Sequence, residues 1–347
     1  MERIVYPDTV DGLYEHLKTK LDGIVPDAEL QIKAEIAHKI NELKKEKNAI
    51  ILGHNYMEPA LFNSIPDFVG DSLGLARVAA ETDADCIVFC GVRFMAETAK
   101  IVNPDRLVLL PAEKAGCSLA ESITPQDVRD LKAQYPGVPV VTYINTYAEV
   151  KAECDVCCTS SNAAEIVNKL ESDTVICLPD EFLAKNVARE TGKKVIYPGQ
   201  HVEDMPESMV VWDGKCEVHE KFTVQDIENV RQHFPDTMVI AHPECPPEVV
   251  EASDFSGSTT KMNNFVSETD ADHYLLLTEC SMSDNIAADN PSKDMLRLCS
   301  VRCPHMNEIT LEDTLRCMEN DIYQIEMEED LRIRAKQSID RMFELSS

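Results

Sequence analysis

Residues 117–127 read CSLAESITPQD, and their pattern, Cys-x6-Thr-x2-Asp, recurs at residues 216–226 and 303–313. We call this pattern the tag. The chain has 13 cysteines, and none of the others is followed by the tag. A threonine with an acid three residues later is typical of a helix N-terminus, where the acid also favours the helix dipole. Each tagged cysteine is therefore predicted to lie in a short loop just before a helix.

The same succession of elements precedes each tagged cysteine. An apolar strand ends in a polar triplet, a helix start rich in hydroxyl groups follows, and a second apolar strand comes next. The tagged cysteines are 99 and 87 residues apart, which is the length of a small α/β unit. Strands that alternate with helices favour parallel sheets with right-handed crossovers. We therefore expect an α/β fold built from three copies of one unit.

The elements of each copy can be placed on the sequence. First strands are expected at residues 50–53, 138–142 and 238–241, and second strands at residues 86–92, 174–178 and 274–278. A helix is expected over residues 27–48, with a buried face formed by Ile32, Ile36, Ile40 and Leu43. Two closing helices are expected over residues 310–320 and 328–345.

Length, charge and cysteine content exclude several classes of protein. A chain of 347 residues is expected to divide into two or three domains. Its net charge of −29 argues against binding to nucleic acid or to anionic membranes, because both need a basic surface. No signal segment or apolar run of roughly 18–20 residues is present, and an odd number of cysteines suits a reducing compartment. We therefore expect a cytoplasmic protein.

The polar triplets predict a cavity for acid–base chemistry. In a parallel sheet, ligands collect at the carboxyl ends of the strands, which is where the triplets lie. If the copies face one another, the outer members of all three triplets converge. These residues are His54, Tyr56, Tyr143, Asn145, His242 and Glu244.

The hydroxyl-rich helix starts predict binding sites for anionic groups. Helix N-termini present free N–H groups and the positive end of the dipole to carboxylates and phosphates. The alternative is that Ser72, Ser160 and Thr259 serve as ordinary helix caps. Three such helix ends around one centre favour a small ligand that carries several anionic groups.

Three equivalent thiols predict a metal centre with an open coordination position. An all-cysteine set favours an iron–sulfur cluster, and a [4Fe–4S] cluster on three cysteines leaves one iron free to act as a Lewis acid. Elimination of water from a polyanionic small molecule is the expected chemistry. Two alternatives stay open, namely a zinc-dependent lyase or aldolase and a non-enzymatic iron–sulfur sensor. Cys299 is the second choice after Cys303, and Cys154 and Cys157 have redox spacing without the strand–helix context of a redox site.

Several short strings closely resemble the quinolinate synthase (NadA-type) family. They are GHNY at residues 53–56, GDSL at 70–73, GVRFM at 91–95, YIN at 143–145, CTS at 158–160, HPEC at 242–245 and GST at 257–259. The resemblance runs in order from about residue 36 to residue 343. It implies three pseudo-three-fold-related αβα domains with small parallel sheets around one central [4Fe–4S] cluster per chain.

The resemblance also implies an activity. Iminosuccinate (iminoaspartate) would condense with dihydroxyacetone phosphate, releasing phosphate and water, to give quinolinate, the pyridine precursor of NAD. The substrates, and the enzyme that supplies the imine, are the expected partners. The expected divisions are an N-terminal segment (1–35), three α/β repeats (36–123, 124–222 and 223–309) and closing helices (310–347).

The resemblance assigns roles to residues that match the family's motifs. The cluster ligands would be Cys117, Cys216 and Cys303. The catalytic groups would be Tyr56, Tyr143, His219 and Glu244. The substrate contacts would be His54, Ser72, Tyr143, Ile144, Asn145, Ser160, His242, Pro243, Glu244 and Thr259. One departure is that residues 199–211 form a longer and more acidic stretch than expected of the family, which leaves the path of that loop open.

Overall fold

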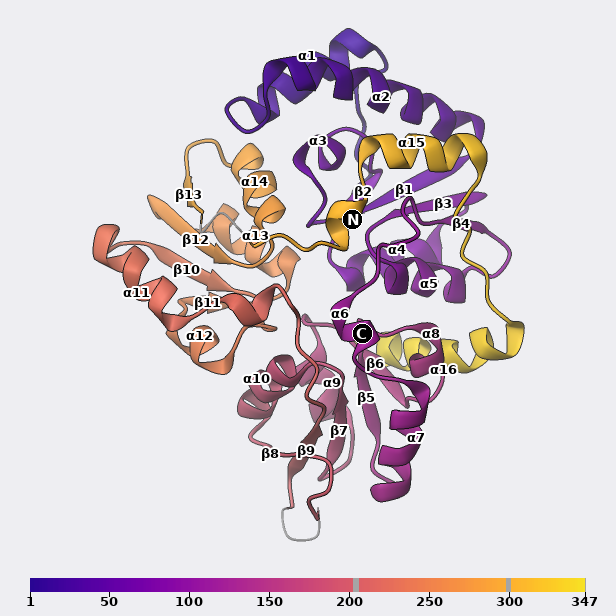
Figure 1. The fold of residues 1–347 in the computed structure, drawn as a ribbon, viewed down its shortest axis with the longest axis vertical. Helices are drawn as coiled ribbons and strands as arrows, with labels where there is room; N and C mark the ends of the chain where they lie inside the picture. Colours follow the sequence, from indigo (N-terminus) through magenta and orange to yellow (C-terminus); the bar gives the residue numbers. More distant parts are fainter. Residues whose placement is uncertain (202–205, 298–300, 347) are drawn as a thin grey trace.

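A computed structural model describes residues 1–201, 206–297 and 301–346, and its chain forms three separate parallel sheets. The strand orders are β2-β1-β3-β4, β6-β5-β7-β9-β8 and β11-β10-β12-β13. In each sheet the unit's first strand in chain order lies between the next two strands of that unit, and the second sheet has five strands where the others have four. Figure 1 shows the sheets as three lobes around a common centre. The expected α/β fold with parallel sheets in triplicate is confirmed.

The described elements include the expected first and second strands of each unit, together with a short strand between them that was not expected. The first unit contains β1 (Ala49–His54), α3 (Pro59–Phe62), β2 (Phe68–Gly70), α4 (Ser72–Glu81), β3 (Cys86–Cys90), α5 (Arg93–Val102), β4 (Leu107–Leu109) and α6 (Ser118–Glu121). The second contains α7 (Pro125–Gln134), β5 (Val140–Tyr143), α8 (Ala148–Lys151), β6 (Val156–Cys158), α9 (Ala163–Lys169), β7 (Val175–Leu178), α10 (Glu181–Thr191), β8 (Lys194–Ile196), β9 (Ser208–Val211) and the 3-10 turn η2 (His219–Lys221). The third contains α11 (Val224–His233), β10 (Met238–Ala241), α12 (Pro247–Ala252), β11 (Phe255–Ser256), α13 (Thr259–Glu268), β12 (His273–Leu277), α14 (Cys280–Asp289), β13 (Asp294–Leu296) and η3 (Met306–Glu308).

Four helices flank these units. They are α1 (Val10–Leu21), α2 (Asp27–Glu46), α15 (Leu311–Asn320) and α16 (Glu329–Leu345). Helix α15 packs on α2 beside the first sheet, whereas α16 packs on α8 and β6 of the second sheet. The closing helices therefore tie the first two units together. None of the described helices combines the length and the apolar character that a bilayer crossing needs.

The buried face of α2 differs from the one expected. Its buried residues include Leu30, Ala34, Ala37 and Ile40, whereas Ile32 is 58% exposed. Spacings of four, three and three residues place the first set on one side of the helix, and two of its four members are alanines. Small side chains let neighbouring helices approach closely, and a pattern based on large apolar residues missed them.

The predicted caps after the tagged cysteines are confirmed. The hydroxyl of Thr124 accepts from the amide of Asp127, and the carboxylate of Asp127 accepts from the amide of Thr124. The helix after the second tag has the same reciprocal pair, and the Thr310 hydroxyl likewise accepts from the amide of Asp313. Each tag therefore fixes the start of α7, α11 or α15, and holds the loop before it in one position.

Strand β1 shows why the triplets lie where they do. All six of its residues are buried, because helices cover both faces of a parallel sheet. His54 is its last residue, Tyr143 is the last residue of β5, and His242 directly follows β10. The polar triplets thus begin at the carboxyl ends of the three central strands.

Candidate active site

One cavity lies where the carboxyl ends of the three sheets meet, and all three units contribute to its wall. The sequence-predicted residues that line it are His54, Tyr56, Ser72, Cys117, Tyr143, Asn145, Ser160, Cys216, His219, His242, Glu244, Thr259 and Cys303. Residues from widely separated positions are therefore brought to one place.

Two of the expected contact residues do not line the cavity. Ile144 and Pro243 are the middle members of their triplets, and successive side chains of an extended chain point to opposite sides. The carbonyl of Ile144 accepts from Nζ of Lys151 at 2.8 Å, and that of Pro243 accepts from Nδ2 of Asn186 at 2.9 Å. Both residues hold the outer members of their triplets through backbone contacts.

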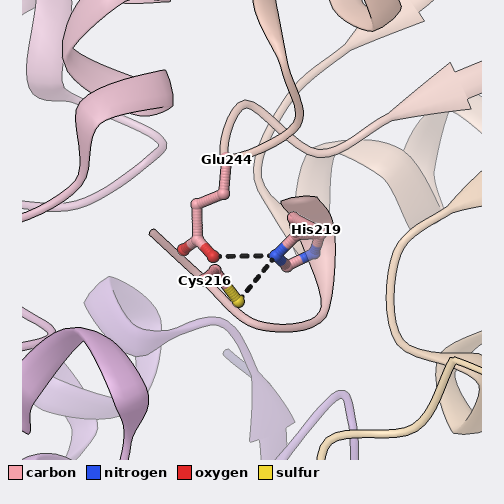
Figure 2. Close-up of side chains that lie close together, drawn as sticks. All are labelled: Cys216, His219 and Glu244. Carbon is pink, nitrogen blue, oxygen red and sulfur yellow. Dashed lines mark hydrogen bonds and ion pairs between the residues drawn. The ribbon is translucent and has the colours of Figure 1, made fainter. Parts of the chain in front are cut away.

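A chain of hydrogen bonds joins the second and third units inside the cavity. The Tyr143 hydroxyl donates to Oε1 of Glu244 at 2.5 Å. The other carboxylate oxygen, Oε2, lies 2.8 Å from Nδ1 of His219, and the same nitrogen lies 3.2 Å from Sγ of Cys216 (Figure 2). A proton shared along this chain can move between the phenol, the carboxylate and the imidazole.

Thr278 extends this network, although the sequence analysis gave it no role. Its hydroxyl lies 3.0 Å from Nε2 of His219 and 2.5 Å from the hydroxyl of Tyr56. The residue follows β12 at the carboxyl end of the third sheet and is buried. Thr278 is the last residue of the expected second strand at residues 274–278, and a hydroxyl at that strand end could have marked it as a site residue. Only the ends of the first strands were used to predict the cavity.

The triplets of the first and third units share one local device. In each, the imidazole Nδ1 accepts from the amide two residues later, at 3.2 Å for His54 and at 3.4 Å for His242. Burial lowers the pKa of His54 to about 4 and that of His242 to about 3. Both rings are therefore neutral at pH 7, and their remaining N–H groups are donors.

Glu244 is a buried carboxylate in the wall of the cavity. Burial would raise the pKa of its carboxyl, but the imidazoles of His219 and His242 and the bonds from His219 and Tyr143 hold that pKa below its ordinary value. Burial and the charge of Glu244 together raise the pKa of Tyr143 well above its usual range. The carboxylate is therefore ionised and can accept a proton, whereas the phenol keeps its own.

The helix starts leave their hydroxyl groups available to a ligand. The cap of α4 is Asp71, whose carboxylate accepts from the amide of Gly74, and the cap of α13 is Ser258. The expected caps Ser72 and Thr259 are instead first-turn residues that line the cavity, and Ser160 lies ahead of the α9 cap. The capping alternative is therefore wrong for these three residues, because neighbours one or two positions away occupy the cap sites.

Thr259 is also oriented by a contact between units. Nδ2 of Asn55 donates to the Thr259 hydroxyl oxygen at 2.8 Å. The hydroxyl hydrogen is then directed to another acceptor, and the residue lines the cavity. The helix start of the third unit thus presents an O–H donor to the space in front of it.

The tagged thiols fit a cluster better than a single ion. All three line the cavity, and burial raises the pKa of each thiol, to about 11 for Cys303. Over the part of the chain that the structure describes, the one set of at least three potential ligands that lies mutually within 4.8 Å is Cys216, His219 and Glu244. The three thiols are therefore not gathered around one ion, whereas a soft donor set with wider spacing suits an iron–sulfur cluster.

Contacts between the loops hold the tagged cysteines together. The amide of Glu217 donates to Oγ of Ser118 at 3.3 Å, which joins the first and second loops. Oε1 of Glu217 lies 3.2 Å from Nε2 of His305, which joins the second and third loops. These residues had no predicted role, although each directly follows a tagged cysteine or lies two positions beyond it.

Other cysteines lie away from the cavity wall. Cys86, Cys90, Cys177 and Cys317 are buried and do not line the cavity. The second choice for the third ligand, Cys299, lies outside the described residues.

Comparison with known proteins gives one consistent match. The family model of the quinolinate synthetase A protein (NadA) matches residues 38–344. A quinolinate synthase of Sinorhizobium fredii is 49% identical over 330 residues, which cover 95% of this chain and 88% of that protein. The quinolinate synthase of Agrobacterium fabrum is 48% identical over 329 residues, covering 95% of this chain and 91% of that protein. Quinolinate synthase 2 of Mesorhizobium japonicum is 47% identical over 334 residues, covering 96% and 98%.

Proposed function

Because the chain belongs to the quinolinate synthase family and makes quinolinate for NAD biosynthesis, we propose that its central cavity condenses iminosuccinate with dihydroxyacetone phosphate. Phosphate and water are released as the pyridine ring closes. The observation that carries the proposal is that one cavity collects three tagged thiols, an ionised carboxylate and several neutral donors. The zinc-dependent lyase and the sensor are not retained, since the matching relatives are quinolinate synthases over nearly the whole chain.

The substrate anions would bind at the helix starts and the strand ends. Iminosuccinate carries two carboxylates, and dihydroxyacetone phosphate carries a phosphate. Ser72 at the start of α4 and Thr259 at the start of α13 offer hydroxyl donors beside free helix N–H groups. Ser160 adds a hydroxyl on the side of the second unit.

Neutral side chains would orient the substrates through hydrogen bonds, without adding a net charge to the cavity. His54 and His242 each present one N–H group to the cavity. Asn145 also lines the cavity, and its buried Oδ1 has no hydrogen-bond partner among the described residues. A buried amide oxygen without a partner costs about 1–3 kcal/mol, so a substrate N–H or O–H group that meets it regains that free energy.

Proton transfer is assigned to the chain that runs from Tyr143 through Glu244 to His219. Ring closure needs a base that removes a proton from carbon and an acid that protonates a leaving hydroxyl. The ionised Glu244 would accept the first proton, and the hydroxyl of Tyr143 would relay it at 2.5 Å. His219 would pass a proton toward Tyr56 through the hydroxyl of Thr278.

The three tagged cysteines would hold one [4Fe–4S] cluster per chain, in keeping with their soft donors and wide spacing. When bound, such a cluster supplies an iron with an open position that acts as a Lewis acid on a substrate oxygen. The residues around the thiols would exclude bulk water and carry the protons. We also keep the five-part division of the chain, with the three units pseudo-symmetric around the cluster.

Anaerobic purification tests the proposal. Iron and sulfide are measured beside zinc, and quinolinate formation is followed with dihydroxyacetone phosphate and freshly generated iminosuccinate. We expect equal amounts of iron and sulfide at the ratio of a [4Fe–4S] cluster, and turnover that is lost when the cluster is removed. Stoichiometric zinc without sulfide in an active protein would overturn the cluster assignment.

A further inference from the structure

We propose that Cys216, His219 and Glu244 form a second metal site, which binds a single divalent cation of the zinc class when the cluster is absent. The site would compete with the cluster, because both use Cys216. The competition rests on the proposed function, because it requires Cys216 to be a cluster ligand.

The three ligand atoms already lie close enough together to bind one ion after small side-chain movements. Sγ of Cys216, Nδ1 of His219 and a carboxylate oxygen of Glu244 lie mutually within 4.8 Å. Figure 2 shows the three side chains pointing toward one another; Cys216 lies in the loop before η2, His219 is the first residue of η2, and Glu244 lies in the loop after β10. The side chains of His219 and Glu244 are only 2% and 4% exposed. The site is thus buried and gathered before any ion arrives.

The donors are those that zinc prefers, and the charges cancel. Thiolate sulfur, imidazole nitrogen and carboxylate oxygen are the usual ligands of zinc, and three protein ligands leave the fourth position open to the cavity. A thiolate, a carboxylate and a neutral imidazole carry two negative charges, which one divalent cation neutralises. On binding, the ion displaces the thiol proton and the Nδ1 proton, and Nε2 of His219 takes up one proton to become the N–H group. One proton per ion is therefore released to solvent.

Outer contacts hold two of the ligands in the orientation that a metal needs. Nε2 of His219 lies 3.0 Å from Oγ1 of Thr278, which fixes the ring and leaves Nδ1 toward the ion. Oε1 of Glu244 accepts from the hydroxyl of Tyr143, which leaves Oε2 toward the ion. Hydrogen bonds of this kind are typical of protein metal sites and raise their affinity.

The cluster and the ion cannot both be bound. Cys117 and Cys303 lie outside the group that holds the ion, so a single ion uses one of the three thiols. That thiol is then withdrawn from the cluster. A cell with free zinc would thereby hold newly made protein in a state without a cluster, until the ion is removed.

The test uses full-length protein stripped of its cluster under anaerobic conditions, with Zn²⁺ or Co²⁺ as the probe. Metal affinity is measured by competition with a chromogenic chelator, and Co²⁺ reports sulfur ligation through its charge-transfer absorption. We expect one ion per chain, and affinity at least about 10-fold weaker in Cys216→Ser and in His219→Ala. The matched variants Cys117→Ser and Cys303→Ser should retain the affinity of the parent.

The variant Thr278→Val retains all three metal ligands. It therefore tests the site independently if the ligand variants fail to fold. It should weaken Zn²⁺ binding by about 10-fold while circular dichroism stays unchanged. Equal weakening in Cys117→Ser and Cys216→Ser would show a site of three thiols and overturn the proposal. Absence of binding to the stripped parent protein would also overturn it.

Competition is measured by rebuilding the cluster from iron and sulfide with and without one equivalent of Zn²⁺. The brown absorbance should fall several-fold with Zn²⁺ and return after a chelator is added. Normal rebuilding with Zn²⁺ still bound would refute competition. A protein that rebuilds its cluster but binds no Zn²⁺ fails only this inference, whereas one that never carries iron and sulfide fails the proposed function.

Discussion

The replacement of Lys151 by Met probes how the second unit holds its part of the cavity. Lys151 is fully buried on α8, and its Nζ donates to the carbonyls of Ile144 and Thr146, at 2.8 Å for the first. These carbonyls flank Asn145, which lines the cavity. Burial lowers the pKa of Lys151, and the nearby carboxylate of Glu97 on α5 partly offsets that effect.

The magnitude follows from what the substitution leaves behind. Methionine fills most of the volume of lysine, so little cavity forms. Two buried carbonyls lose a charged donor, at about 1–3 kcal/mol each. The carboxylate of Glu97 keeps a partner of its own, because Nε of Arg93 donates to its Oε1 at 2.8 Å. We expect the free energy of unfolding of Lys151→Met to fall by about 2–6 kcal/mol, the sum for the two carbonyls.

Urea unfolding of the anaerobic protein, followed by circular dichroism, measures the change. The control is Lys132→Met, because Lys132 is 38% exposed and pairs with Asp155 at 3.2 Å, and an exposed pair contributes about 0–1 kcal/mol. A double variant with Glu97→Gln should lose less than the sum of its two single changes. The apparent KM should rise in Lys151→Met as Asn145 loses its support. A loss no larger than that of Lys132→Met would refute the reasoning.

Four further changes test the site. Cys303→Ser should abolish the cluster absorbance or make the cluster highly labile, whereas Cys317→Ser in the core should leave the cluster intact. An intact cluster in Cys303→Ser would show that Cys303 is not a ligand. Tyr143→Phe should keep the cluster but lower kcat by about 10²-fold, the scale of a lost acid–base group, and normal turnover would make its role structural. Thr259→Val should raise KM more than it lowers kcat, and unchanged substrate affinity would show that no anion meets this hydroxyl. Glu217→Gln should speed cluster loss in air by weakening the link between the cysteine loops, and an unchanged rate would make that link irrelevant to cluster retention.

Local sequence patterns predicted the scaffold well because their causes are local. A cap such as Thr124 with Asp127 needs only four residues, and an apolar run such as that of β1 needs only one strand. Placement of His54, Tyr143 and His242 at strand ends followed from the same patterns. The convergence of these residues then followed from repetition of the unit.

Contacts between units were outside the reach of those patterns. The hydroxyl of Thr278 meets Tyr56 across 222 positions of sequence, and Asn55 meets Thr259 across 204. Neither pair has a spacing or composition that marks it. Lys151 was missed for a related reason, since a lysine is normally solvent-exposed and only its surroundings show that it is buried.

The common centre of the three sheets has a consequence for the asymmetry of the cavity. In each sheet the unit's first strand lies between the next two strands of that unit, so three similar strand ends meet at the cavity. The strand-end triplets differ, however, with His-Asn-Tyr, Tyr-Ile-Asn and His-Pro-Glu at the three walls. Only the third triplet includes a carboxylate, Glu244, so the proposed base is present at one strand end and absent from the triplets of the other two. The triplicated backbone thus provides the enclosure, and the divergence of a few side chains makes its three sides chemically different.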